Sequence, residues 1–265
     1  MRGNVYLKTL ADLRGQILVW SAGLIGIAAA NVLLFPTVQS FPGLISFLDS
    51  MPPAFKAMVG DVQSMAQLEG FLRVKLFEPL PLLLAIFAVG QGAGLIAGEV
   101  EAKSMDLLLS RPVPRWRVVA GKFLALVTAT ILMTGSMAVG VVVCAKIIGA
   151  DITSSYVVKS SANGLPLTWV FGALALLGSV ITLRSRTAAV AVGVLVVASF
   201  TFETLRLLSP VLRPWTSVSL FAQQKAGVAL DGAVDPGSIV MLLLVAVVVA
   251  AGAAAVFERR DLTVG

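Results

Sequence analysis

Long stretches without charged residues are the feature that most constrains the fold of this chain. No Asp, Glu, Lys or Arg occurs between residues 15 and 48, and five later stretches of about 20 residues or more contain at most two such residues each. A helix needs about 20 predominantly apolar residues to cross the hydrocarbon core of a bilayer. The composition agrees, because 58% of the 265 residues are hydrophobic and only 13% are charged. The sequence therefore indicates a polytopic membrane protein rather than a soluble domain.

These stretches predict an all-α fold in which six transmembrane helices form a single domain over residues 1–265. We place the spans at residues 16–35, 78–98, 118–145, 165–184, 187–207 and 237–257. Pro36 is expected to end the first span, because proline lacks the N–H that a continuing helix needs. Residues 184–186 leave room only for a minimal turn, so the fourth and fifth helices should be antiparallel neighbours.

The residues before the first span predict a short amphipathic helix on the membrane surface. Apolar residues recur there at helical spacing between charged ones, namely Tyr6, Leu10, Leu13 and Ile17. This is the pattern of an interfacial helix. A signal peptide is the alternative, because the three alanines at residues 28–30 resemble a cleavage region. The long polar leader and the length of the apolar run favour the transmembrane interpretation.

The distribution of charge predicts the orientation of the chain. Six spans place both termini on the same side of the membrane. If that side is cytoplasmic, its segments hold 12 of the 20 Lys and Arg residues but only 6 of the 14 Asp and Glu residues. The whole net charge of +6 then lies inside, as the positive-inside rule requires. We therefore expect a multi-pass protein of the plasma or inner membrane with cytoplasmic termini, and no nucleic-acid partner, since no base-stacking aromatic residues alternate with the basic ones.

The residue inventory argues against most catalytic and metal chemistry. The chain has no histidine and a single cysteine, Cys144, which excludes His-ligated zinc, a Ser-His-Asp triad and a thiolate metal cluster from this chain alone. The phosphate-binding pattern GxxxxGKS/T is absent, because Gly121-Lys122 lacks the upstream glycine and is followed by Phe123. We expect this chain to be no enzyme and to hold no metal and no cofactor.

Two charged residues inside a predicted span are candidates for a transport path. Glu203 and Arg206 lie toward the outer end of the fifth span and can pair at i, i+3. Charged side chains in a bilayer are costly and often functional, so a gate or a substrate contact is one interpretation. An ion pair at the interface with no such role is the other.

Three glycines on one face of the second span predict close helix packing. Gly90, Gly94 and Gly98 recur at intervals of four residues. Small residues at this spacing allow two helices to approach closely in lipid. The alternative is that glycine is simply frequent in membrane helices.

A charged segment, residues 98–122, separates the second span from the third. It contains five Lys or Arg and three Asp or Glu residues. Glu99 and Glu101 lie near the start of a helix predicted over residues 99–115, where negative charge interacts favourably with the helix dipole. The two prolines between Arg111 and Arg115 should end this helix. Its narrow apolar edge consists of Met105, Leu108, Leu109 and Pro112.

This combination predicts a cytoplasmic helix that docks on a protein partner. A helix that merely lies on the membrane surface is the alternative. Such a helix, however, would not need three acidic residues beside an anionic lipid leaflet.

Two motifs carry a resemblance to a known family. The first is GEVEAKSMDLLLSRPVPR over residues 98–115, followed by Gly121-Lys122, and the second is FERRDL over residues 257–262. Together with the six spans they resemble the ABC transporter permeases of the type-two exporter class, and the likeness covers essentially the whole chain. One departure is Lys103-Ser104, where that family usually has Gly-Thr.

The resemblance implies that the helix over 99–115 couples the membrane domain to a separate cytoplasmic ATPase subunit. ATP and Mg would then be bound by that partner, and two permeases, identical or homologous, would assemble with two ATPases in the bilayer. The coupling residues implied in this way are Glu99, Glu101, Lys103, Ser104, Met105, Leu108, Leu109, Arg111, Pro112 and Arg115.

Two functions follow from these features. The first is the permease subunit of an ATP-driven exporter, which forms the translocation path. The alternative is a membrane scaffold or assembly subunit that docks a cytoplasmic protein without transporting anything. Substitution of Glu99 and Glu101 separates them, because lost turnover in an intact complex indicates coupling and dissociation indicates scaffolding. An intramembrane enzyme or a secondary carrier would need buried charged or nucleophilic groups, which the spans nearly lack.

Overall fold

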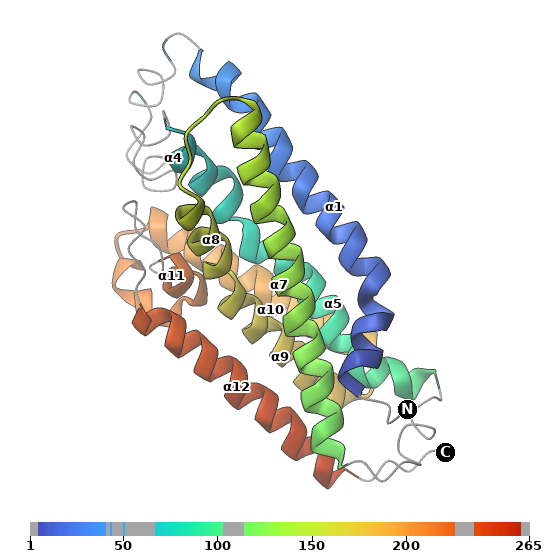
Figure 1. Ribbon diagram of the computed structural model, residues 1–265. Coiled ribbons are helices and arrows are strands. Elements are labelled where there is room, and N and C mark those ends of the chain that lie inside the picture. Colours follow the sequence, from blue (N-terminus) through green and yellow to red (C-terminus); the bar gives the residue numbers. More distant parts are fainter. Residues whose placement is uncertain are drawn as a thin grey trace.

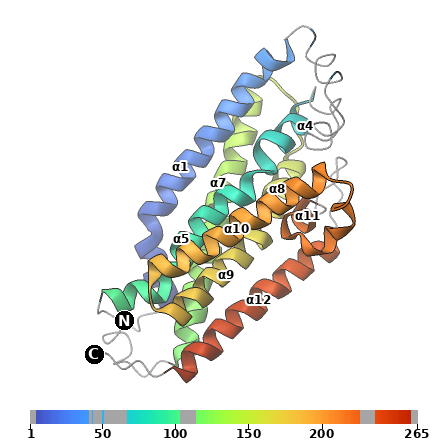
Figure 2. The ribbon, with the colours of Figure 1, turned by 180° about the vertical axis from the view of Figure 1, so that it is seen from behind.

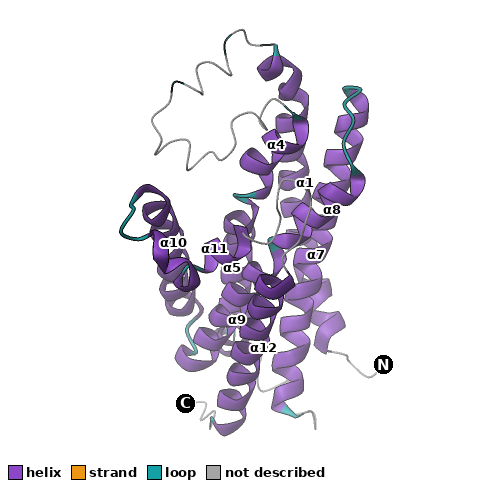
Figure 3. Cartoon of the chain, turned by 90° about the vertical axis from the view of Figure 1, so that its left-hand side faces the viewer, coloured by secondary structure: helices purple, strands orange, loops and turns teal. Residues whose placement is uncertain are grey.

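The protein is an elongated helical bundle (Figure 1). A computed structural model describes residues 5–40, 43, 50, 67–102, 114–225 and 236–260. Within these residues all regular secondary structure is helical (Figure 3). Six helical segments are long and apolar enough to cross a membrane. The prediction of an all-α membrane protein with six spans is therefore confirmed.

The helices are as follows in chain order: α1 Val5–Gln39, α4 Leu68–Leu72, a π-helical turn Arg73–Phe77, α5 Leu80–Glu101, α7 Arg115–Ile147, α8 Ser154–Asn163, α9 Leu165–Thr182, α10 Ser185–Leu208, a 3-10 helix Arg213–Val218, α11 Leu220–Lys225 and α12 Pro236–Arg259.

Two helices, α5 and α9, form the centre of the bundle. They contact each other along their length and are the most buried of the long helices. They approach closely at Gly92 and Gly172, where a Cβ atom on Gly92 would lie 2.6 Å from the carbonyl oxygen of Gly172. Further along, the backbone N–H of Ala97 donates a hydrogen bond of 2.8 Å to the buried Ser179 hydroxyl. Backbone packing at glycine thus sets the spacing of the two central helices.

The remaining long helices surround this pair. Helix α1 packs against α7 on one side of the bundle, and α12 packs against α9 and α7 on the other (Figure 1). From behind, α10 runs across α5 and α9 (Figure 2). In the most apolar 18-residue stretch of α1 and of α12, only 17% of the residues are buried. These outer helices present apolar faces to the surroundings, as lipid-facing helices do.

Both ends of the described chain lie at the same end of the bundle. Helix α1 begins there and α12 ends there (Figure 1). We call this end the termini end and the other one the far end. The termini end also holds the last turn of α5, the first turn of α7 and the connection from α9 to α10.

That connection is as short as predicted. Leu183 adopts a left-handed conformation, with φ of 52°, and α10 begins at Ser185. The Thr182 hydroxyl accepts a hydrogen bond of 3.2 Å from the N–H of Arg184, which closes the turn.

The prediction that Pro36 ends the first helix is wrong. Helix α1 continues to Gln39 with Pro36 inside it. A proline so near the end of a helix removes one hydrogen bond and leaves the rest of the turn intact, and Ser40 still donates its N–H to the Pro36 carbonyl at 3.0 Å. Helix α1 also runs without interruption from Val5 through the residues expected on the membrane surface, whose interfacial position stays a prediction.

Short helices occupy parts of the predicted loops. Residues 68–77, expected within a loop, form α4 and the π-helical turn that lead into α5. Helix α8 lies in the expected loop between the third and fourth spans, and it includes Lys159. At the far end, the 3-10 helix and α11 follow α10, and Trp215 is 56% exposed.

Candidate coupling site

Glu99 at the end of α5 forms an ion pair with Lys122 of α7. The distance from Lys122 Nζ to Glu99 Oε1 is 2.6 Å, and the two side chains are 4% and 20% exposed. A charge-assisted hydrogen bond this sheltered from water is strong, and the loss of either partner strands a buried charge. The pair therefore fixes the last turn of α5 to the first turns of α7.

Glu101, the last residue of α5, binds the beginning of α10. Ser185 donates its backbone N–H to Oε1 of Glu101 at 2.9 Å and its hydroxyl to Oε2 at 2.6 Å. The first N–H groups of a helix lack partners within the helix, and the positive end of its dipole favours a carboxylate. Glu101 thus caps α10 from a different helix.

Two arginines connect the remaining helices at the termini end. Arg115, the first residue of α7, donates Nη1 to the carbonyl of Phe257 at 3.4 Å and to that of Arg260. Its guanidinium carbon lies 5.8 Å from the centre of the Phe257 ring. Arg260 donates in turn to the carbonyls of Val180 and Ile181. A cation at the last carbonyls of α9 also opposes the negative end of that helix dipole.

These contacts join α5, α7, α9, α10 and α12 at one level. We call them the end contacts, and they comprise Glu99 with Lys122, Glu101 with Ser185, Arg115 with the end of α12, and Arg260 with the end of α9. Three of their residues were predicted to couple the chain to an ATPase: Glu99, Glu101 and Arg115. The structure brings these three to the same end of the bundle and gives each an intramolecular partner.

The other predicted coupling residues lie between Glu101 and Arg115 in the sequence. Residues 103–113 fall outside the described part of the chain, and they include Lys103, Ser104, Met105, Leu108, Leu109, Arg111 and Pro112. Of the helix expected over 99–115, the structure describes residues 99–101 as the end of α5 and Arg115 as the start of α7. The end contacts therefore flank the segment expected to meet the partner.

The partners of these residues were not found by sequence reasoning. Lys122 lies about one helical turn inside the third predicted span, and a charge at that depth was a signal that it needs a partner. Ser185 and Arg260 carried no such signal, because a serine in a turn and an arginine after a span are both ordinary.

A second polar cluster lies at the far end, and it contains the predicted pair Glu203 and Arg206. The pair is present at i, i+3, with Arg206 Nε 2.8 Å from Oε2 and Nη2 3.0 Å from Oε1 of Glu203. Ser219 donates its hydroxyl to Oε2 of Glu203 at 2.7 Å and accepts the N–H of Ala222 at 3.1 Å. Glu203 is only 2% exposed. These contacts attach the start of α11 to α10, and a role as a gate stays a prediction.

The glycine stripe packs against no neighbour within the described chain. A Cβ atom built on Gly90, Gly94 or Gly98 would have no atom of a neighbouring element of the described chain within 4 Å. Gly92, on another face of α5, makes the close contact instead. Close helix packing through these three glycines stays a prediction.

Comparison with known protein families finds a match. The family model described as ABC-2 family transporter protein matches residues 25–262. No curated protein matches the chain.

Proposed function

We propose that this chain, which belongs to the ABC-2 family of transporter proteins, is the permease subunit of an ATP-driven exporter and forms its translocation path. Membership of the family implies a bilayer and a partner ATP-binding subunit, and permeases of this kind are membrane subunits without enzymatic activity of their own. ATP and Mg would be bound by that partner on the cytoplasmic side, where both termini of this chain would also lie.

The end contacts are the observation that supports this proposal. They involve Glu99 and Glu101, which immediately precede residues 103–113 in the sequence, and Arg115 and Lys122, which follow soon after. A partner that binds residues 103–113 would therefore act on both ends of the segment. The residues on both sides of this segment are held to other helices by the end contacts. A displacement of the segment would therefore move those helices.

The same contacts give the displacement a route into the membrane domain. Movement of the last turn of α5 would act on α7 through Glu99 and Lys122, and on α10 through Glu101 and Ser185. A ligand shifts a conformational equilibrium only by the difference in its affinity for the two states. In this proposal ATP binding in the partner supplies that difference, and the helices shift between inward-open and outward-open arrangements.

Co-purification tests the proposal. The full chain carries an affinity tag, is expressed in its native host and is extracted in mild detergent. We expect an ATP-binding subunit and a second permease copy or homologue in the purified complex. A preparation without any ATP-binding subunit that still transports would overturn the proposal.

A scaffold would also recover a partner, so a second measurement is needed. Glu101→Gln, at an exposed residue, should leave the ATP-binding subunit bound while ATP-dependent transport falls. Dissociation of that subunit, with no transport by the wild-type complex, would indicate a scaffold instead.

A further inference from the structure

Helix α11 is a short element that contacts three long helices at the far end of the bundle. It has six residues, Leu220–Lys225, and it lies near the beginning of α12 (Figure 1). It contacts α9, α10 and α12. A helix shorter than about 12 residues is marginal in isolation, so the position of α11 depends on these contacts.

The contacts of α11 with α10 and α12 pair polar groups with one another. Ser219, which precedes α11, donates its hydroxyl to Glu203 of α10 at 2.7 Å. The side-chain oxygen of Gln223 accepts the hydroxyl of Ser238 of α12 at 3.1 Å. The side-chain nitrogen of Gln223 donates to the carbonyl of Thr216 at 3.4 Å. Both ends of the Gln223 amide therefore have partners.

The contact of α11 with the end of α8 is different. Asn163, the last residue of α8, donates Nδ2 to the backbone carbonyl of Gln224 at 2.7 Å. The two residues are only 6% and 4% exposed. Neither Asn163 Oδ1 nor Gln224 Oε1 has a hydrogen-bond partner within the part of the chain that the structure describes. Rotation of the Asn163 amide by half a turn would not help, because its oxygen would then face another carbonyl.

These unpaired oxygens weaken the contact between α8 and α11. A buried amide oxygen without a donor carries the cost of its lost hydration. The bond from Asn163 to Gln224 offsets only part of this cost, since one hydrogen bond is formed and two oxygens remain unpaired. Separation of α11 from α8 would return both amides to water at the end of the bundle.

The apolar part of the contact favours α10 in the same way. Phe221 is 1% exposed and lies between two rings, with centres 5.9 Å away in Phe171 of α9 and 5.5 Å away in Phe200 of α10. The ring of Phe200 meets Phe221 edge to face at 79°, a favoured arrangement of aromatic pairs, whereas Phe171 is tilted by 37°. Helix α11 is therefore held more firmly on α10 than on α8 and α9.

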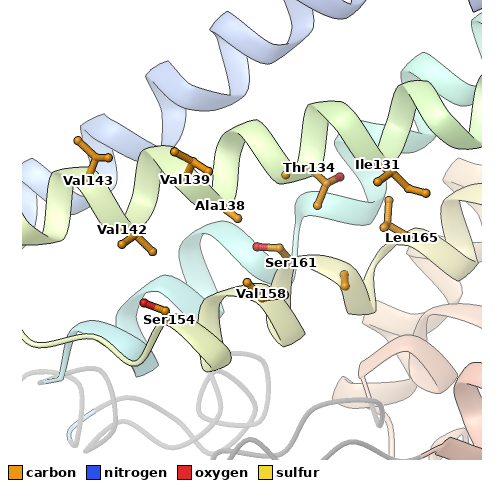
Figure 4. Close-up of a pocket in the computed structure, with 12 residues that line it drawn as sticks. Ile131, Thr134, Ala138, Val139, Val142, Val143, Ser154, Val158, Ser161 and Leu165 are labelled. Atoms are coloured by element: carbon orange, nitrogen blue, oxygen red, sulfur yellow. The ribbon is translucent and has the colours of Figure 1, made fainter.

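The end of α8 also has open space on the side that faces α7. An apolar groove with a volume of about 440 Å³ lies between the two helices. Its lining includes Ser161 and Ala162 of α8 and Leu165, the first residue of α9 (Figure 4). The last turn of α8 therefore has room to move away from α11.

We propose that α11 is a lid, which detaches from α8 and α9 while it stays attached to α10 and α12. Its detachment opens the far end of the bundle between these two pairs of helices and exposes the amides of Asn163 and Gln224 to water. A role of this opening in transport, as the outward opening of the path, rests on the proposed function. The opening itself is a property of this chain and is tested without a partner.

Distances between spin labels test the proposal on the full chain in lipid nanodiscs, without an ATP-binding subunit. Cys144, the single cysteine, is replaced by alanine, and two label pairs are introduced at exposed positions. Lys159→Cys with Val218→Cys spans the contact between α8 and α11. Val218→Cys with Val240→Cys connects the residues before α11 to α12. We expect a short and a longer distance for the first pair, and one distance for the second.

Two substitutions should change the ratio of the longer to the shorter distance in opposite directions. Gln224→Met removes the unpaired oxygen at similar side-chain size, so the ratio should fall at least about fivefold. Asn163→Asp removes the donor to Gln224 and places a carboxyl group there, which is ionised in water at pH 8. Because burial of that charge is costly, the ratio at pH 8 should rise at least about tenfold.

Gln223→Met is the matched control. It is the same substitution at the neighbouring residue, but the partners that it removes are Ser238 and Thr216 rather than a residue of α8. The ratio for the pair at residues 159 and 218 should therefore stay at the wild-type value.

Three results would overturn the proposal. A single short distance between residues 159 and 218 in both wild type and Asn163→Asp would show that α11 does not detach from α8. A ratio that does not fall in Gln224→Met would show that the unpaired oxygen does not weaken the closed contact. A second distance between residues 218 and 240 would show that α11 leaves α12 as well. None of these results depends on transport, so they are distinct from a failure of the proposed function.

Discussion

Gly92 is the residue at which a single methyl group should matter most. A Cβ atom there would lie 2.6 Å from the backbone oxygen of Gly172 and 3.0 Å from Cβ of Ala175. Backbone cannot move aside as a flexible side chain can, so α5 and α9 would have to separate. We expect Gly92→Ala to lower the free energy of unfolding by about 1 to 3 kcal/mol, measured by denaturant titration in detergent.

Gly94 is the matched control on the same helix. A Cβ there would meet no atom of the described chain within 4 Å. Gly94→Ala should be neutral or stabilise by roughly 0.5 to 1 kcal/mol, because alanine is the better helix former. Equal losses of unfolding free energy in Gly92→Ala and Gly94→Ala would contradict the close contact of α5 with α9 at Gly92.

The ion pair of Glu99 and Lys122 predicts strongly coupled substitutions. Glu99→Gln leaves the ammonium group of Lys122, whose side chain is 4% exposed, without its counter-charge, and we expect a loss of about 3 to 5 kcal/mol. Lys122→Met in the same chain removes the stranded charge. The double variant should therefore be more stable than Glu99→Gln alone, as measured by a double-mutant cycle of thermal unfolding. Additive losses would show that the two groups act independently.

Residue partners were predictable only where they are local in sequence. Glu203 and Arg206 lie three residues apart on one helix, so their pairing follows from helix geometry. Lys122 lies 23 residues from Glu99, and their contact depends on how α5 and α7 meet. In the same way, Gly92 rather than Gly90, Gly94 or Gly98 makes the close contact with α9. Which glycine does so depends on which face of α5 meets α9.

At the scale of elements, the sequence predicts the long helices better than their ends. Twenty apolar residues are sufficient to define a span, and all six spans are present. Helix α8 was missed because its serines, Lys159 and Asn163 have the composition of a loop. Its buried face is defined by contact with α7 and α9, which no local pattern reveals.

Arg115 should hold α7 to α12. Arg115→Ala removes its donors to the carbonyls of Phe257 and Arg260, and hydrogen bonds to charged groups contribute about 1.5 to 3 kcal/mol. We expect a lower midpoint of thermal unfolding in detergent. Arg117→Ala is the control, because Arg117 is exposed and its guanidinium carbon lies 5.3 Å from the ring centre of its neighbour Trp116. This substitution should cost less than about 1 kcal/mol. A larger loss at Arg117 would argue against the end contacts.

Substitution of Glu203 can distinguish a structural role of its pair with Arg206 from a role of the pair as a gate. Glu203→Gln breaks a pair with Arg206 in which the glutamate is 2% exposed, and a structural role predicts a loss of about 3 to 5 kcal/mol in stability. Thermal unfolding and transport are measured on the same variant. Lost transport at unchanged stability would indicate a gate, and a parallel loss of both would indicate that the pair holds α11 on α10.

At the scale of the whole molecule, different kinds of contact hold the two ends of the bundle together. The termini end is joined by polar contacts among five helices, which flank residues 103–113. The far end is joined by the cluster around Glu203. Family membership and six spans were predictable from motifs and apolar length. The arrangement of the end contacts was not, because it results from the packing of helices distant in sequence.

The most direct test of coupling through the end contacts is the ATP hydrolysis rate of the assembled complex. The tagged chain is purified with its ATP-binding subunit, and the rate is divided by the amount of bound subunit for wild type, Glu101→Gln and the control Glu258→Gln. Our account predicts equal amounts of bound subunit in all three, with a rate at least about tenfold lower for Glu101→Gln alone, equivalent to about 1.4 kcal/mol. An unchanged rate per bound subunit in Glu101→Gln would contradict it.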